Sequence, residues 1–130
     1  MLRRNPKKPK TKQELARIGE EHAARYLRAK GYRVIERNFR APRAEVDIIA
    51  EHRGVLVFVE VKALSSTAFM EPHQKVTPWK QRQIARAAAR YLSAREKRER
   101  LTRFDVVEVL LTPAGRVQQV RLIQGAFQAT

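Results

Sequence analysis

The sequence predicts one α/β domain in which a central mixed sheet is flanked by helices, with its elements in the order α-β-β-β-α-β-β. Two stretches repeat apolar residues at helical spacing, and the runs between and after them are rich in β-branched residues and bounded by turn signals. At 130 residues the chain is long enough to bury about two-thirds of the surface that its unfolded form exposes. A hydrophobic core is therefore expected to hold the fold without cross-links.

The first helix is predicted from Gln13 to Lys30, and Gly31 supplies its stop signal. Its apolar face consists of Leu15, Gly19, His22, Ala23, Tyr26 and Leu27. Residues 1–12 hold six basic residues and two prolines but no acid, a composition that cannot pack a core. We therefore expect a disordered basic arm over residues 1–12 and a folded domain over residues 13–125.

Three strands are predicted next. Residues 32–38 and 45–51 are the first two, with a turn region at residues 41–43 between them. The third strand contains the unbroken apolar run Val55–Val59, which is typical of a strand buried on both faces. Because only His52-Arg53-Gly54 separates the second strand from the third, the two are expected to pair as an antiparallel hairpin.

The second helix is predicted to begin at Pro78, with Thr77 as its N-cap. Trp79, the one tryptophan of the chain, lies in the first turn and is expected to pack rather than to stack on a base. Residues 104–111 and 117–123 complete the order as two strands separated by a turn. The apolar face of this helix consists of Ile84, Ala87, Ala88, Tyr91 and Leu92.

The net charge of the chain is +15, from 28 Lys and Arg against 13 Asp and Glu, which points to a polyanionic partner. Nucleic acid is the leading candidate, because Arg82, Arg86 and Arg90 recur every four residues and form a basic ridge on the second helix. Since aromatic residues are few, no base-stacking platform is predicted. A solubilising surface, a membrane surface and association with ribosomes are the alternatives.

The absence of cysteine and of long apolar runs excludes several classes of protein. The chain has no cysteine, which excludes disulfides, thiolate catalysis and cysteine-ligated metal centres and fits a reducing compartment. The basic N-terminus lacks the apolar stretch of a secretory signal, and no run approaches the roughly 20 apolar residues that cross a bilayer. We expect a cytoplasmic protein without a membrane span.

Charged residues at the end of the third strand are the candidates for chemistry. Glu60 and Lys62 lie two residues apart and so share a face of the strand. If the hairpin register brings Asp47 near Glu60, two carboxylates converge, and each raises the cost of ionising the other unless a cation lies between them. Oxygen ligands of this kind suit Mg²⁺ or Mn²⁺. Lys62 could then hold or deprotonate a water that attacks a phosphodiester.

Other interpretations of these residues stay open. Asp47, Glu60 and Lys62 also fit a salt-bridge cluster at the end of a sheet. Glu20 lies at the edge of the first helix's apolar stripe, where it could either reach the sheet as a third carboxylate or pair with a nearby arginine. Glu21 falls on the opposite, solvent side.

Segments spread over about residues 15–110 match a known family. They are Gly19-Glu20, Ala23, Tyr26-Leu27, Gly31-Tyr32, Arg37-Asn38-Phe39-Arg40, Glu45-Val46-Asp47-Ile48-Ile49, Val57-Phe58-Val59-Glu60-Val61-Lys62, Lys80-Gln81 and Arg103-Phe104-Asp105-Val106. Together they resemble the YraN-like family of small bacterial proteins. That family looks like a minimal member of the PD-(D/E)XK nuclease superfamily, akin to Holliday-junction resolvases and restriction endonucleases. The resemblance implies a restriction-endonuclease-like core.

The same resemblance implies roles for individual residues. Asp47 and Glu60 would bind Mg²⁺ or Mn²⁺, with the Val61 carbonyl as an additional ligand, and Lys62 would be the catalytic lysine. Glu20 would match the helical acid of the resolvase-like members.

The second helix also receives roles from the resemblance. Lys80 or Gln81 would match the polar residue that such folds place on the helix after the Glu-x-Lys strand. We group both with Arg82, Arg86 and Arg90 as predicted nucleic-acid-binding residues.

Three functions are compatible with these observations. The first is a metal-dependent endonuclease that acts on DNA in preference to RNA, and on branched or structured DNA by analogy with resolvases. The second is a non-catalytic nucleic-acid-binding protein of the same fold, and the third is an adaptor or membrane-surface protein that uses the basic arm. Because related nucleases often act as dimers, a homodimer fits the resemblance. The apolar strand 104–111 fits an interface and burial in the sheet equally well.

Overall fold

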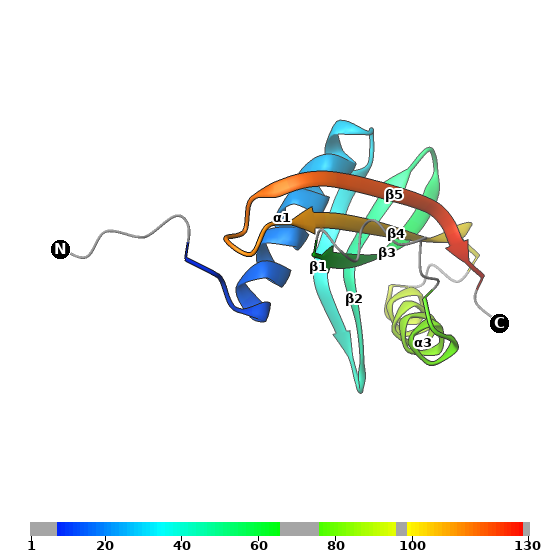
Figure 1. The fold of residues 1–130 in the computed structure, drawn as a ribbon. Helices are drawn as coiled ribbons and strands as arrows, with labels where there is room; N and C mark the ends of the chain where they lie inside the picture. Colours follow the sequence, from blue (N-terminus) through cyan, green and yellow to red (C-terminus); the bar gives the residue numbers. More distant parts are fainter. Residues whose placement is uncertain (1–7, 66–75, 96–98, 129–130) are drawn as a thin grey trace.

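The computed structural model describes residues 8–65, 76–95 and 99–128. Its elements follow the predicted order α-β-β-β-α-β-β, and they form one mixed sheet with two helices packed on it (Figure 1). The predicted α/β fold class is therefore confirmed. The elements are α1 (Lys12–Ala29), β1 (Arg33–Ala41), β2 (Ala44–His52), β3 (Val55–Leu64), α3 (Pro78–Ala94), β4 (Thr102–Leu111) and β5 (Val117–Phe127).

A capping box starts α1. The Thr11 hydroxyl accepts the N–H of Glu14 at 3.1 Å, and the Glu14 carboxylate accepts the N–H of Thr11 at 2.9 Å, so two otherwise unpaired donors are satisfied. The N–H of Lys10 also donates to the Pro113 carbonyl at 2.8 Å. The helix thus begins one residue earlier than predicted. Residues 1–7 lie outside the described residues, so the basic arm stays a prediction.

The sheet has the strand order β1-β2-β3-β4-β5. The first three strands form an antiparallel meander, and the predicted hairpin between β2 and β3 is confirmed. Its turn residues Arg53 and Gly54 have φ angles of 51° and 81°, as a two-residue type I′ turn requires. β3 and β4 are parallel, with α3 in the connection between them, and β5 runs antiparallel to β4.

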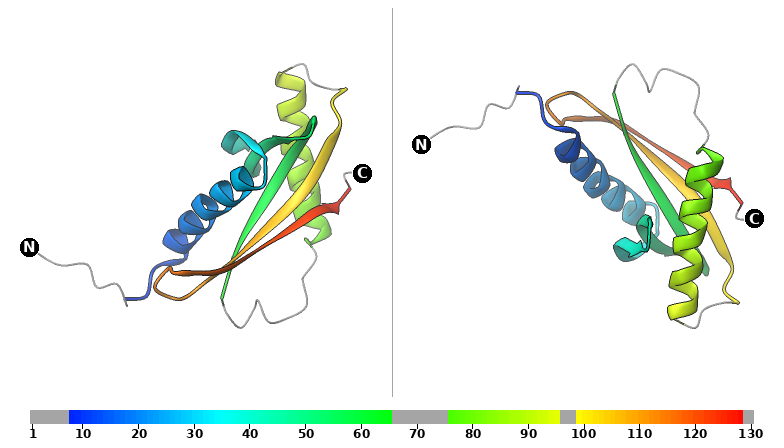
Figure 2. Two further views of the ribbon diagram at one scale, coloured as in Figure 1. Left: turned by 90° about the horizontal axis from the view of Figure 1, so that it is seen from above. Right: turned by 90° about the horizontal axis from the view of Figure 1, so that it is seen from below.

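The two helices cover opposite faces of the sheet (Figure 2). Val57 and Val59 of β3 belong to the core under α1, whereas Leu56 and Phe58 belong to the core under α3. Each of the four is at most 1% exposed, so this strand is buried on both faces, as its unbroken apolar run predicts. Burial of each such side chain stabilises the fold by about 1.5–3 kcal/mol.

Gly19 allows α1 to approach β3 closely. A Cβ at this position would lie 3.2 Å from the Cβ of Ala63, which is closer than ordinary packing permits. The next residue of the helix is Glu20. The close approach therefore fixes how near the Glu20 carboxylate comes to the sheet.

The strand β4 lies between β3 and β5 and is buried from Phe104 to Leu111. Burial inside the domain therefore accounts for its apolar residues, and the homodimer stays a prediction. Within the described parts of the chain, no helix is both long enough and apolar enough to span a bilayer.

A buried polar network surrounds Asp105 on β4. Its carboxylate accepts the Tyr32 hydroxyl at 2.8 Å, the Arg103 guanidinium at 2.8 and 3.0 Å, and the N–H of Gly125 at 3.0 Å. The Tyr32 oxygen in turn accepts from Arg103 at 2.9 Å and from Gln124 at 2.8 Å. Asp105 is fully buried, and its hydrogen bonds compensate the loss of water. This network ties the start of β1 to β4 and β5.

Candidate metal and nucleic-acid site

The site begins where the ladder between β2 and β3 ends. The paired residues run from His52 and Val55 to Ile48 and Val59, so the next positions along the two strands are Asp47 and Glu60. Beyond the ladder, the Asp47 carboxylate accepts the backbone N–H of Val61 at 2.8 Å. This bond replaces a strand-to-strand hydrogen bond and holds the carboxylate beside Glu60.

Burial and proximity make these two carboxyl groups hard to ionise together. Burial, followed by the charge of Asp47, raises the pKa of Glu60 to about 8. Burial also raises the pKa of Asp47, against the lowering effect of the hydrogen bonds from Val61 and Glu60. The protonated Glu60 carboxyl therefore donates to Asp47, and the pair retains a proton near neutral pH. A cation can replace that proton.

Two lysines lie on the Glu60 side of the pair. The Lys80 ammonium of α3 is 3.7 Å from the Glu60 carboxylate, and the charges of Lys80 and Lys62 both lower the pKa of Glu60 without offsetting its burial. Lys62 lies opposite Glu108 in the parallel ladder of β3 and β4. Glu108 is almost fully buried and pairs with Arg121 of β5, so a row of charges crosses three strands beside the carboxyl pair.

Glu20 approaches the pair from α1. Burial and the charge of Asp47 raise the pKa of Glu20, which places its carboxylate within electrostatic reach of Asp47. With its amide oriented to donate, Asn38 lies 2.8 Å from Glu20 and 3.2 Å from Glu45. Asn38 is the β1 residue opposite Asp47, between the pairs Arg37–Ile48 and Phe39–Val46. The structure thus places Glu20 at the sheet, as one of the two interpretations predicted.

Glu21, the next residue of α1, pairs with an arginine, which was the alternative interpretation for Glu20. Its carboxylate accepts the Arg37 guanidinium of β1 at 2.9 Å and lies 3.8 Å from Arg25. The hydrogen bond and charge of Arg37 hold the pKa of Glu21 below its usual value. One acid of this helix therefore pairs with arginine, and the other faces the carboxyl pair.

The donor set fits a magnesium-type ion held by few protein ligands. Among the described residues, no group of three or more His, Asp and Glu side chains could jointly hold a metal. Mg²⁺ commonly uses only one or two carboxylates and keeps several waters. Because the N–H and C=O of one strand residue face the same neighbour, the Val61 carbonyl points to the same side as its N–H bond to Asp47. Asp47, Glu60 and Val61 could therefore share one ion.

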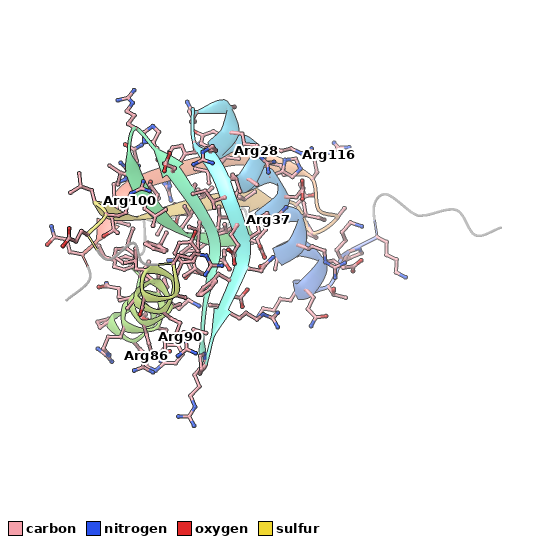
Figure 3. The ribbon with its side chains drawn as sticks, turned by 180° about the vertical axis from the view of Figure 1, so that it is seen from behind. Arg28, Arg37, Arg86, Arg90, Arg100 and Arg116 are labelled. Atoms are coloured by element: carbon pink, nitrogen blue, oxygen red, sulfur yellow. The ribbon has the colours of Figure 1, made fainter. Side chains whose placement is uncertain are left out.

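The predicted nucleic-acid residues of α3 divide into two groups. Arg82, Arg86 and Arg90 are exposed, and Figure 3 shows Arg86 and Arg90 on the side of the helix turned away from the sheet. Lys80 instead reaches Glu60. The Gln81 amide donates to the Val76 carbonyl at 2.7 Å, so it secures the start of the helix. Of the two residues proposed to face the carboxylates, the structure brings only Lys80 to them.

The prediction that Trp79 packs into the protein is wrong, because 61% of its surface is exposed. It lines a surface pocket of about 360 Å³ between the first turn of α3 and the β1–β2 hairpin. The helical spacing could have predicted this exposure. Trp79 is five residues before Ile84, whereas a separation of three or four residues would put it on the apolar face of the helix. The pocket is also lined by Arg40, Arg43, Glu45, Lys80 and Gln83.

A family model described as "Uncharacterised protein family UPF0102" matches residues 19–109, a span that contains the elements from the middle of α1 to most of β4 and every predicted site residue. The chain belongs to UPF0102.

Similar UPF0102 proteins occur in several other organisms. A UPF0102 protein of Symbiobacterium thermophilum is 49% identical over 111 residues, which cover 85% of this chain and 93% of the relative. Another of Moorella thermoacetica is 43% identical over 117 residues, covering 90% and 98%. One of Caldicellulosiruptor saccharolyticus is 40% identical over 116 residues, covering 89% and 98%. The predicted YraN-like membership is thus confirmed as membership of UPF0102.

Proposed function

We propose that this UPF0102 protein is a metal-dependent endonuclease that hydrolyses phosphodiester bonds in DNA, with branched or otherwise structured DNA as its substrate. The observation that supports the proposal most strongly is the partly buried Asp47–Glu60 pair. Burial raises the pKa of both carboxyl groups, and the charge of Asp47 raises that of Glu60 further, so the fold maintains an electrostatic cost that a bound cation would remove. A purely structural ion pair would not need two acids at this point.

Each residue near the pair has a chemical role in the proposal. Asp47 and Glu60 would hold Mg²⁺ or Mn²⁺ with the Val61 carbonyl, and the ion would stabilise negative charge on the scissile phosphate. Lys62, on the same face of β3 as Glu60, would orient the attacking water or accept its proton. Glu20 would complete the acidic side of the site from α1.

The basic surface supports a nucleic-acid substrate. The chain carries a net charge of +15, and the exposed arginines Arg82, Arg86 and Arg90 follow one side of α3. Contacts of this type bind phosphates and position a duplex without reading its sequence. The proposal of DNA and of branched structure rests on the resemblance to resolvase-like nucleases.

Calorimetric binding of Mn²⁺ and Mg²⁺ tests the proposal first. The parent should bind one ion at physiological salt, and Asp47→Ala/Glu60→Ala should lose that binding. Glu36→Ala/Glu51→Ala is a matched control, because it too removes two acids from the sheet. These acids come from ion pairs outside the site: Glu36 of β1 pairs with Arg95, and Glu51 of β2 pairs with Arg33 and Arg100. The control should bind like the parent.

Cleavage assays then test the reaction. With Mn²⁺ or Mg²⁺, the parent should cut a four-way junction, and Asp47→Ala should abolish the cutting while binding is retained. Equal cleavage by the variant and the parent, or a parent that binds no metal with or without DNA, would reject the proposal.

One observation favours a non-catalytic nucleic-acid-binding protein as the second candidate. Lys80 already lies 3.7 Å from Glu60, so the chain's own lysine and a retained proton could balance the pair without a metal. This candidate predicts salt-sensitive binding and no divalent-metal-dependent cutting of linear, branched or single-stranded substrates.

A further inference from the structure

We propose that the pocket between α3 and the β1–β2 hairpin receives an unpaired nucleotide of the nucleic acid, whose base stacks on Trp79. The proposal takes nucleic acid as the ligand class from the proposed function, but it does not need a metal or a reaction. It adds which part of the substrate the protein recognises: a base outside a duplex.

The position of Trp79 is the first support. Among the described residues, Trp79 and Leu101 are the large hydrophobic side chains that are mostly exposed. A single exposed apolar residue is ordinary, so exposure alone carries no conclusion. Trp79 differs from Leu101 because it lines a pocket and offers an aromatic face, the surface on which proteins stack bases.

The charges around the pocket are the second support. Arg40 and Arg43 line it from the hairpin, and Lys80 lines it from α3. Both arginines are exposed, and Glu45 is the one acid among the described residues that line the pocket. An aromatic face bordered by three cations matches a nucleotide, which joins a planar base to a phosphate.

The pocket also adjoins the carboxyl pair. Lys80 lines the pocket and lies 3.7 Å from Glu60. Glu45 lines it as well, and it lies 3.2 Å from the Asn38 amide that contacts Glu20. If the proposed metal ion at Asp47 and Glu60 also held a phosphate of the strand, a neighbouring nucleotide would lie near Trp79; binding in the pocket itself does not depend on that ion.

Base pairing determines which nucleotides of a nucleic acid can enter this pocket. A base inside a duplex is already stacked on both faces and must be extruded before it can reach Trp79, which costs free energy. A base in a single strand or a single-stranded flap is already unpaired, so it does not have to be extruded from a duplex. Stacking on an aromatic side chain then raises affinity by about tenfold per base, so the pocket selects unpaired nucleotides.

The single tryptophan makes the test direct, because all tryptophan fluorescence of the chain comes from Trp79. The full chain is titrated in EDTA at physiological salt with a ten-nucleotide oligothymidylate and, separately, with a ten-base-pair blunt duplex. Fluorescence anisotropy of labelled oligonucleotides measures binding independently. We expect strong quenching by the single strand and little quenching by the duplex at equal saturation.

Variants separate stacking from charge. Trp79→Ala should weaken binding of the single strand about tenfold and leave duplex binding within twofold, while Trp79→Phe should retain most of the affinity. Leu101→Ala is the matched control, because it truncates an exposed apolar side chain near Leu56, at the other end of β3. It should leave both affinities unchanged.

Two results would overturn the inference. One is single-strand binding that saturates without quenching, and the other is an equal loss of single-strand and duplex binding in Trp79→Ala. If the parent binds no nucleic acid at all, the premise and the inference both fall. A failure of the endonuclease proposal, seen as absent metal binding or absent cutting, leaves these metal-free measurements unaffected.

Discussion

Asp105, which is fully buried, and the partly buried Asp47–Glu60 pair are acids of the same sheet, but the protein compensates them in different ways. Asp105 receives hydrogen bonds from a guanidinium, a hydroxyl and a backbone N–H. Asp47 receives one backbone N–H and otherwise faces a second acid, and the pKa of each member of the pair is raised. A fully compensated acid is part of the framework. An under-compensated pair is where binding or chemistry is expected.

The largest expected effect comes from removing the compensated acid. Asp105→Ala leaves Arg103 and Tyr32 without their buried partner, and breaking such a pair costs about 3–5 kcal/mol. Asp47→Ala removes the acceptor of the Val61 N–H but also the charge that raises the pKa of Glu60, so its cost should be smaller, about 1–2 kcal/mol. Urea unfolding of both variants measures the difference. Equal destabilisation would show that the two acids are compensated alike.

The next effect is a dependence of stability on pH. The unfolded Glu60 titrates near 4.5 and the folded one near 8, so the folded protein holds more protons between these values. The contribution of Glu60 to the metal-free stability is therefore fully present below about pH 4.5 and is lost as pH rises through 8. The loss should be about 2–3 kcal/mol, less than the whole shift at about 1.4 kcal/mol per unit, because Asp47 shares the proton.

Glu60→Gln isolates this contribution. Glutamine can donate to Asp47 as the protonated acid does, but it cannot lose the proton. In EDTA the variant should match the parent near pH 5 and exceed its stability near pH 9. Parallel urea midpoints for parent and variant across this range would contradict the raised pKa of Glu60.

A smaller effect is expected within the Asp105 network. Tyr32→Phe keeps the ring, which stacks on His52 with centroids 4.1 Å apart, but it removes the hydroxyl that bonds Asp105, Arg103 and Gln124. The cost should be about 1–2 kcal/mol, measured by urea unfolding. Tyr26→Phe, on the half-buried side of α1, is the control and should have almost no effect.

The smallest effect concerns Lys80. The Lys80 side chain is 43% exposed and its ammonium lies 3.7 Å from the Glu60 carboxylate, so the attraction is partly screened and worth less than about 1 kcal/mol. Lys80→Met should leave stability nearly unchanged and raise the pKa of Glu60 further above its ordinary range. Carboxyl chemical shifts followed by NMR during a pH titration would show this, and an unchanged midpoint would mean that Lys80 does not act on the pair.

Short-range patterns predicted most of the fold and the centre of the site. The helix signals Thr77 and Pro78, the hairpin at Arg53 and Gly54, and the apolar run of β3 are all local, and each is confirmed. The hairpin register alone then brings Asp47 to Glu60. Their roles as metal ligands stay predictions, because sequence spacing places the groups without showing what they bind.

The features that sequence did not predict depend on long-range packing. The Asp105 network needs Tyr32, Arg103 and Gly125 from three places in the chain. No periodic pattern in the sequence predicts that these residues come together. The exposure of Trp79 depends on how α3 is rotated on the sheet. That rotation is set by the buried residues Ile84, Ala88 and Tyr91, which leave the first turn facing the hairpin.

The strand order also bears on the route by which the chain folds. Asp47 and Val61 are 14 residues apart, whereas Tyr32 and Asp105 are 73 apart, so closing the longer loop costs about 1.5 kcal/mol more in chain entropy. The three-stranded meander is therefore expected to form in the transition state, with β4 docking afterwards. Substitutions around Asp105 should then mainly accelerate unfolding, whereas changes at the Arg53-Gly54 turn should slow folding.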